Sequence, residues 1–236
     1  MTVATTAIHA SAQFILSILL LCFAGMAFAQ GGEVTENDKA VFAFFTLNGH
    51  TPAYEQWIEN SPKYLAETTY DGKREVLEAE LLRLKWGFGT YNVERDFIKI
   101  RTPVKLLIQG NHLAFSFHEA SGRNVPYFPF PYGKEWIAVI INDLDPLFEL
   151  ELTPAEKART ANLPKNVVFD GEIVLHLRPI KADNDATHKL DGTDHWLMMS
   201  DTGRLELLSE GTALATYTAP WFLESAEKGS LPSLKQ

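Results

Sequence analysis

The stretch that decides the fold is residues 98–117, which read IKIRTPVKLLIQGNHLAFSF. Five apolar side chains share one parity, those of Ile98, Ile100, Val104, Leu106 and Ile108, and the basic side chains of Lys99, Arg101 and Lys105 stand on the other. Because successive side chains of a β-strand point to opposite faces, this alternation predicts a strand with one buried and one wet face. Residues 109–112 then predict a hairpin turn, and residues 113–117 alternate again as the return strand.

More strands are predicted downstream, from the same two-residue period or from short apolar runs. They span residues 135–141, 148–152, 167–177, 196–199, 204–208 and 213–217. The first of them is apolar on both parities, which indicates a central strand that is covered on both faces. Pro179 is expected to end a strand, because proline cannot donate a hydrogen bond to a sheet. Asp201–Gly203 is expected to be the turn of a hairpin.

Helical periodicity dominates the N-terminal part of the chain. An apolar stripe with spacings of four, three and four residues is formed by Leu77, Leu81, Leu84 and Phe88. It predicts an amphipathic helix at 71–91 that lies on a sheet. Shorter helices are expected at 36–48, 51–59 and 154–162. The last begins with the capping box Thr153–Glu156, and paired aromatic residues leave a strand as the alternative for the first.

Together these elements predict one α+β domain over residues 36–224, in which N-terminal helices pack on a mainly antiparallel sheet of about six to eight strands. The chain of 236 residues suits a single domain. A helical part at 36–91 and a separate β part at 92–222 are the alternative. Residues 30–35 are expected to be a flexible lead-in, and 225–236 a frayed C-terminal tail.

The N-terminus predicts export. Residues 14–29 are almost wholly apolar and end in Ala27-Phe28-Ala29. This run is shorter than the roughly 20 residues of a membrane-spanning helix, and its small-x-small end is the pattern that a signal peptidase cleaves. Residues 1–29 are therefore predicted to be a signal peptide, which leaves the mature protein periplasmic or secreted and without stable membrane insertion. An uncleaved anchor or a lipoprotein signal at Cys22 is the alternative.

Composition excludes several classes of protein. Cys22 is the only cysteine, so cleavage would remove thiol catalysis and thiolate metal sites from the mature protein. With 46% hydrophobic and 22% charged residues, the chain has the composition of a soluble globular protein. Asp and Glu number 30 against 21 Lys and Arg, and a net charge of −9 argues against a nucleic-acid partner, because contacts to phosphates need a basic protein.

The order of these segments resembles uncharacterised families of exported bacterial proteins, which are domains of unknown function. The resemblance rests on the run from Tyr70 through the Leu-rich helix to Tyr91, and on the strands that carry Phe97–Ile100 and Ile173–Pro179. In such families a signal peptide precedes a helix and then a β-rich region. The resemblance therefore implies export and this layout over most of the mature chain, and it assigns no role to any residue.

Local motifs of catalysis are missing from the sequence. It contains neither the Gly-x-Ser-x-Gly motif of serine hydrolases nor the His-Glu-x-x-His motif of zinc proteases. Gly87-Phe88-Gly89 ends a predicted helix, whereas a phosphate-binding glycine loop opens one. Residues 183–195 hold several carboxylates and two histidines, but they do not match a calcium-binding EF-hand loop, and a solvated loop is expected there. No metal and no cofactor is expected.

The most distinctive stretch is VPYFPFPY at residues 125–132, which lies in a predicted loop at 119–134 and precedes Trp136. Its prolines hold the backbone extended, and its rigid aromatic rings suit contacts with a ligand or a partner. The candidate binding residues are Tyr127, Phe128, Phe130, Tyr132 and Trp136. Packing of this loop against the core is the alternative.

A second candidate surface follows the polar parity of the strands. If the strands are neighbours, a positive patch would gather Lys99, Arg101, Lys105, Ser116, His118, His176 and Arg178. Such a patch would accept an anionic ligand or an acidic partner segment. Solvated side chains on an outer face are the alternative.

These features favour a non-catalytic binding or interaction module of the bacterial envelope, whose partner is an envelope protein or a small ligand. The alternative is a periplasmic or secreted hydrolase with dispersed His, Asp and Glu catalytic residues. A hydrolase needs a pocket with convergent titratable groups, here around His176, His188 or His195. A binding module needs instead a patch near Tyr127–Trp136.

Overall fold

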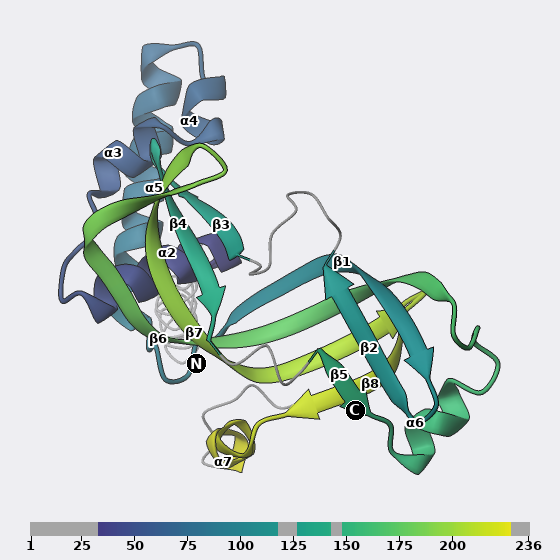
Figure 1. Cartoon of the computed structure of the whole chain (residues 1–236). Coiled ribbons are helices and arrows are strands. Elements are labelled where there is room, and N and C mark those ends of the chain that lie inside the picture. The colour runs from purple at the N-terminus through teal and green to yellow at the C-terminus, as the bar shows by residue number, and fades with distance from the viewer. Residues whose placement is uncertain (1–32, 118–126, 143–147, 228–236) are drawn as a thin grey trace, which may run out of the picture. The chain divides into compact units, whose positions relative to one another are not determined.

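The computed structural model of the protein describes residues 33–117, 127–142 and 148–227 (Figure 1). The predicted signal peptide lies outside these residues. The described elements belong to one compact unit that begins at Val34. N-terminal helices precede an eight-stranded sheet in which every strand pair is antiparallel except β4 with β7, so the predicted α+β class is confirmed.

Four helices begin the described chain, and they are α2 (Glu36–Leu47), α3 (Tyr54–Glu59), α4 (Pro62–Ala66) and α5 (Tyr70–Thr90). The first is a helix and not the alternative strand, and its N-terminus is held by a capping box in which Thr35 and Asp38 exchange hydrogen bonds. The sequence analysis missed α4. It begins at Ser61, whose side chain caps Tyr64 N, with Pro62 at the first helical position.

The strands are β1 (Ile98–Gln109), β2 (His112–Phe117), β3 (Tyr127–Tyr132), β4 (Glu135–Ile141), β5 (Glu149–Glu151), β6 (Val168–Leu190), β7 (Thr193–Ser209) and β8 (Thr212–Thr218). Their order across the sheet is β3-β4-β7-β6-β1-β2-β5, and β8 pairs with β7. The predicted β1–β2 hairpin is confirmed, with Gln109 opposite His112. The predicted central strand 135–141 is β4, which lies between β3 and β7.

Two predicted strand ends were wrong. β6 continues past Pro179, because register shifts on both sides of this residue let the ladder with β7 accommodate it. Asp201–Gly203 is not a hairpin turn but the middle of β7. Here one edge of β7 changes its neighbour, from β4 along residues 196–200 to β8 along residues 204–209.

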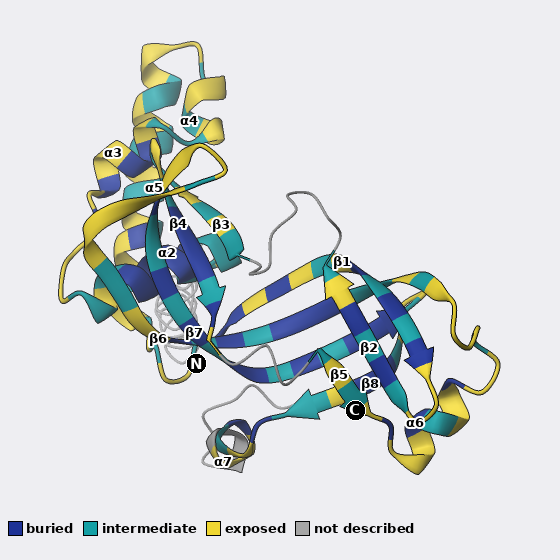
Figure 2. Ribbon diagram, in the orientation of Figure 1, coloured by how far each residue is buried: buried dark blue, intermediate teal, exposed yellow. Residues whose placement is uncertain are grey.

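Part of the core lies between α2 and the sheet, and another part lies among β1, β2, β6, β7 and β8, where Leu106, Leu113 and Leu205 are fully buried. Figure 2 shows the buried residues running along α2 and along the strands that it crosses. Phe42 and Phe44 of α2 are buried, and Phe44 contacts the indole of Trp196 on β7, with ring centroids 6.1 Å apart. Hydrophobic burial of this kind contributes about 1.5–3 kcal/mol for each large side chain.

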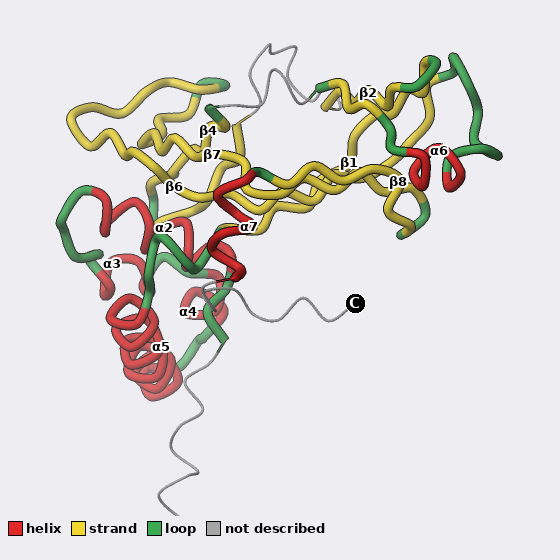
Figure 3. The backbone as a smooth tube through the Cα atoms, turned by 90° about the horizontal axis from the view of Figure 1, so that it is seen from below, coloured by secondary structure: helices red, strands yellow, loops and turns green. Residues whose placement is uncertain are grey.

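α5 packs on other helices and not on the sheet, which corrects the prediction. Figure 3 shows α2 next to the strands, with α3, α4 and α5 beyond it. Leu84 of the predicted stripe is buried, and Phe88 packs edge-on against Phe42 of α2 with centroids 5.6 Å apart. A stripe of this kind indicates that a helix has a covered face, but it does not say whether a sheet or other helices cover it.

Two short helices complete the described chain. α6 (Pro154–Arg159) starts with the predicted capping box of Thr153 and Glu156, and Glu156 also accepts a hydrogen bond from Thr216 N on β8 at 2.9 Å. α7 (Pro220–Glu227) follows β8 and was not expected. No helix in the described part of the chain is both long and apolar enough to cross a membrane.

Candidate functional site

The aromatic stretch is a strand and not a loop. Residues Tyr127–Tyr132 form β3, which pairs along its whole length with β4 and stands at one end of the sheet. The loop prediction was wrong for these residues, because prolines are tolerated in a strand that lies at the edge of a sheet. Gly133 supports the tight turn between β3 and β4 with a φ of 61°. Residues 119–126 of the predicted loop lie outside the described chain.

Three of the five candidate aromatic residues face the core. Phe128, Phe130 and Tyr132 are partly buried against it. The ring of Tyr132 lies 5.6 Å from that of Trp57 on α3, and its hydroxyl accepts a hydrogen bond from the backbone N of Ala53 at 2.7 Å. Burial raises the pKa of Tyr132. These contacts join β3 to the helices.

Tyr127 and Trp136 lie on the other face of the sheet. They belong to the opposite parity of the β3–β4 ladder, in which Trp136 stands opposite Pro131. Both rings contact His195, at centroid distances of 5.3 and 6.3 Å, and the Tyr127 hydroxyl donates to Asp191 at 2.9 Å. The five candidates are therefore divided between two faces and do not form one surface.

The acidic stretch 183–195 is a β-hairpin and not a solvated loop. β6 continues to Leu190, and β7 starts at Thr193 after a turn with positive φ at Asp191 and Gly192. His188 Nε2 lies 3.2 Å from Asp183 Oδ2 in an exposed pair. Over the described residues, no group of three or more His, Cys, Asp or Glu side chains is placed to hold a metal ion.

The other two candidate histidines, His176 and His195, pack against neighbouring groups of the fold. His195 is 3% exposed, and its Nδ1 lies 2.9 Å from the carbonyl oxygen of Thr193. His176 contacts Phe222 of α7 with ring centroids 6.0 Å apart. Burial, followed by the charge of Lys99, lowers the pKa of His176. Neither the pocket described below nor a shallow hollow beside Phe169 and Ser209 has any of the three histidines in its lining.

The predicted positive patch is largely neutralised. Arg101 pairs with Glu172 of β6, and Lys105 pairs with Asp170 at 2.6 Å. Arg178 stacks its guanidinium 4.0 Å from the centre of the Trp221 ring. Arg178 also lies 3.6 Å from carboxylate oxygens of Glu94 and Asp201, so three of the four cations of the predicted patch, all but Lys99, have acidic neighbours in the described part of the chain. His118 lies outside the described residues.

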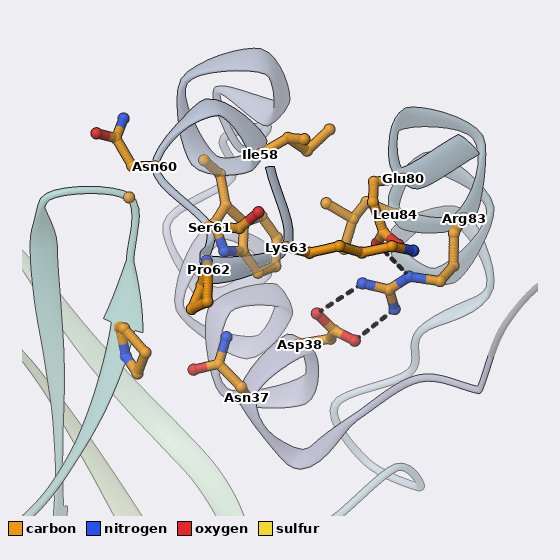
Figure 4. Close-up of a pocket in the computed structure, with 13 residues that line it drawn as sticks. Asn37, Asp38, Ile58, Asn60, Ser61, Pro62, Lys63, Glu80, Arg83 and Leu84 are labelled. Carbon is orange, nitrogen blue, oxygen red and sulfur yellow. Dashed lines mark hydrogen bonds and ion pairs between the residues drawn. The ribbon is translucent and has the colours of Figure 1, made fainter. Parts of the chain in front are cut away.

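A pocket of about 340 Å³ lies where the four N-terminal helices meet the β3–β4 turn (Figure 4). Its volume is at the lower end of the range of small-molecule sites, about 300–1,000 Å³. Trp57, Ile58 and Leu84 form its apolar side, and all three are buried. Pro131 and Gly133 contribute the edge that belongs to the sheet. The pocket is therefore concave and partly apolar, as a ligand site needs to be.

Four charged side chains line this pocket, and each of them takes part in an ion pair. Arg83 on α5 donates to both oxygens of Asp38 on α2, at 2.6 and 3.3 Å. Its Nε donates to Glu80 Oε2 at 2.7 Å, and Lys63 on α4 reaches across to Glu80 Oε1 at 2.7 Å. Cations and anions thus alternate along one chain of contacts, with no excess of either charge.

The pairing sets the protonation state of the pocket. Burial by itself raises the pKa of Glu80, but the hydrogen bonds and charges of Lys63 and Arg83 outweigh it, and the pKa of Glu80 is lowered. Burial acts against the charge of Arg83 too, but its two carboxylate partners raise the pKa of this guanidinium. Both shifts favour the charged forms of Glu80 and Arg83, whereas a general acid or base has a pKa near the working pH.

The polar wall of the pocket consists of Asn37, Asn60 and Ser61. Asn37 Oδ1 is buried and has no hydrogen-bond partner among the described residues. Leaving a buried carbonyl unsatisfied costs about 1–3 kcal/mol. Figure 4 shows the nitrogen of the Asn37 amide pointing from α2 toward the Ser61–Pro62 segment and its oxygen pointing away from that segment, so a ligand in the pocket would lie next to the amide nitrogen.

This site was not predicted from the sequence. Asp38 stands beside the apolar run Ala40–Phe45, and a carboxylate next to such a run was the one local signal that it would be buried and paired. Its partner Arg83 is 45 positions away and lies outside the apolar stripe of the predicted 71–91 helix. None of the five aromatic candidates lines the pocket, although their neighbours Pro131 and Gly133 do.

No family model matches the chain, and neither the curated proteins nor the solved structures include a match to it. The site is therefore interpreted from its own chemistry.

Proposed function

We propose that the protein is a non-catalytic binding module of the bacterial envelope, and that the pocket between α2, α3, α4, α5 and the β3–β4 turn holds a small ligand. The observation that carries this proposal is the alternation of ion pairs along the pocket, from Asp38 through Arg83 and Glu80 to Lys63. A wall of paired charges can orient a bound molecule, and the lowered pKa of Glu80 and the raised pKa of Arg83 do not suit proton transfer near pH 7.

This arrangement favours binding over the hydrolase alternative. A hydrolase needs a nucleophile or a general base whose side chain points into a pocket. The exposed His188–Asp183 pair has the chemistry of a base with its orienting carboxylate, but it lies on the β6–β7 hairpin and outside the pocket. The proposal therefore rests on shape and charge in the helical pocket.

A blocking variant tests whether the pocket binds small molecules. Asn60 lies in the pocket lining, where it is half-buried and donates only to the backbone of its own helix, to Gln56 O at 2.7 Å, so Asn60→Trp would add an indole at the pocket wall. The exposed Asn111 in the β1–β2 turn gives the matched control Asn111→Trp. Saturation-transfer NMR with a mixed fragment library should give hits that Asn60→Trp removes and Asn111→Trp keeps. Equal hits for both variants would refute the proposed site.

Export is the second part of the proposal, and it rests on the apolar run 14–29 with its Ala27-Phe28-Ala29 end. Expression of the full chain in a bacterium, followed by N-terminal sequencing of the protein from the periplasm or the medium, should give Gln30 as the first residue. Recovery of the intact chain with the inner membrane would show instead that the segment is retained as an anchor.

A further inference from the structure

We propose that the helical pocket selects an uncharged ligand with an apolar ring face and several hydroxyl or amide groups, which is the chemistry of a monosaccharide. This inference rests on the proposed function, since it names the class of ligand for the same pocket. It is carried by three features of the lining, which are its charge balance, its half-buried amide and its apolar side.

Charge balance is the first feature. Asp38 is 3% exposed and both of its oxygens accept hydrogen bonds from Arg83, while Glu80 is held by Arg83 on one oxygen and by Lys63 on the other. A charged ligand would lose its water without gaining a counter-charge, unless it displaced one member of these pairs. A neutral ligand avoids that cost, so the closed network discriminates against both anions and cations.

The amide of the half-buried Asn37, whose Oδ1 is enclosed, is the second feature. Its Oδ1 has no partner among the described residues, and its amide nitrogen points from α2 toward the segment that closes the pocket. The terminal torsion of asparagine is broad and roughly two-fold, so rotation of the amide exchanges its oxygen and nitrogen. Asn37 can therefore present either an acceptor or a donor, which suits a hydroxyl group because a hydroxyl both donates and accepts.

The apolar side is the third feature. Trp57, Ile58 and Leu84 are at most 7% exposed, and they stand across the pocket from the polar wall. A ring with hydroxyl groups at its rim and C–H groups on its face would satisfy both sides at once. A purely apolar ligand would leave Asn37 unsatisfied, and a strongly polar chain without an apolar face would not use the indole.

Three ring-matched probes test the class of ligand: N-acetylglucosamine is neutral, glucosamine is a cation and glucuronate is an anion. Saturation-transfer NMR at low salt should show the neutral probe binding at least about five times more tightly than either charged probe. Asn37→Leu should weaken the neutral probe about five- to ten-fold, the loss that corresponds to one hydrogen bond. The matched control is Asn48→Leu, at the other end of α2, because Asn48 Nδ2 is also buried without a described partner and does not line the pocket.

The outcomes separate this inference from the proposed function. If a charged probe binds as tightly as the neutral one and Asn60→Trp removes it, the class of ligand is wrong but the pocket is a binding site. If none of the three probes binds while library fragments still bind in the pocket, the proposed class of ligand is again wrong. If Asn37→Leu and Asn48→Leu weaken the neutral probe equally, the binding does not involve the pocket amide and the inference fails. Thermal melts of both variants check that each remains folded.

Discussion

Arg83 on α5 and Asp38 on α2 stand 45 positions apart in the sequence and meet in a two-bonded ion pair at 2.6 and 3.3 Å. The carboxylate is almost fully buried, while the guanidinium side chain keeps 19% of its surface exposed. The same carboxylate also accepts a hydrogen bond from Thr35 N at 2.8 Å. One pair therefore caps α2, joins α2 to α5 and forms one wall of the pocket.

Removing the guanidinium should destabilise the fold. Arg83→Met leaves Asp38 as an uncompensated buried charge, and we expect a loss of about 2–4 kcal/mol in the free energy of unfolding, since Arg83 is partly exposed. Adding Asp38→Asn should recover about 1 kcal/mol, because asparagine removes the charge and keeps an acceptor for Thr35 N. Urea unfolding followed by tryptophan fluorescence measures both values. A single variant as stable as the wild type would contradict the structural role of this pair.

Gly203 should not tolerate a side chain. A methyl group at this position would come within 2.6 Å of the Trp221 ring and closer still to that of Phe222, because α7 packs directly on β7 here. We expect Gly203→Ala to cost about 1–3 kcal/mol and to loosen α7. Gly89→Ala is the control of opposite sign, since nothing stands within 4 Å of its added methyl and alanine favours the helix. Thermal melts should therefore shift down for the first variant and up for the second.

His176 should make stability depend on pH. Burial, and then the charge of Lys99, lowers its pKa in the folded protein, while an unfolded chain keeps about 6.5. The unfolded state then binds the proton more readily, so the contribution of His176 to stability is complete above about pH 6.5 and declines as the pH falls below that value. His176→Gln should reduce the loss of unfolding free energy between about pH 7.5 and pH 5.5. His50→Gln is the control, because His50 is exposed. If His176→Gln leaves the slope of the unfolding free energy against pH unchanged, this explanation is wrong.

Pro129 and Pro131 should protect the free edge of β3. In an antiparallel pair, alternate residues of a strand direct their backbone N–H groups toward the neighbouring strand. Pro129 and Pro131 have no N–H, and they occupy the positions whose backbone groups point away from β4. The edge of β3 therefore lacks two of the N–H groups that another strand would need. Replacing both by threonine should increase self-association, measured by light scattering over time at constant protein concentration. The exposed pair Thr212 and Thr216 on β8 can be exchanged for Ser as a control that leaves this edge unchanged.

The sequence by itself was enough for the local elements and the class of fold. The two-residue period of 98–117 gives the β1–β2 hairpin, the stripe through Leu84 gives α5, and the box of Thr153 and Glu156 gives the start of α6. These signals are local, because periodicity and capping depend on residues within a few positions of each other. Three elements were missed. They are α7, the proline-containing strand β3, and α4, although Ser61 and Pro62 are a local start signal for α4.

Only the tertiary structure decided what those elements pack against and where the pocket lies. The aromatic stretch is a strand because it pairs with β4. β7 continues through Asp201–Gly203 because β4 pairs with it before this segment and β8 pairs with it after. The pocket depends on Asp38 meeting Arg83, and such a pairing follows from long-range packing that no local pattern records. The physical reason is that burial turns an ordinary surface charge into a group that needs a partner, and burial is a property of the assembled fold.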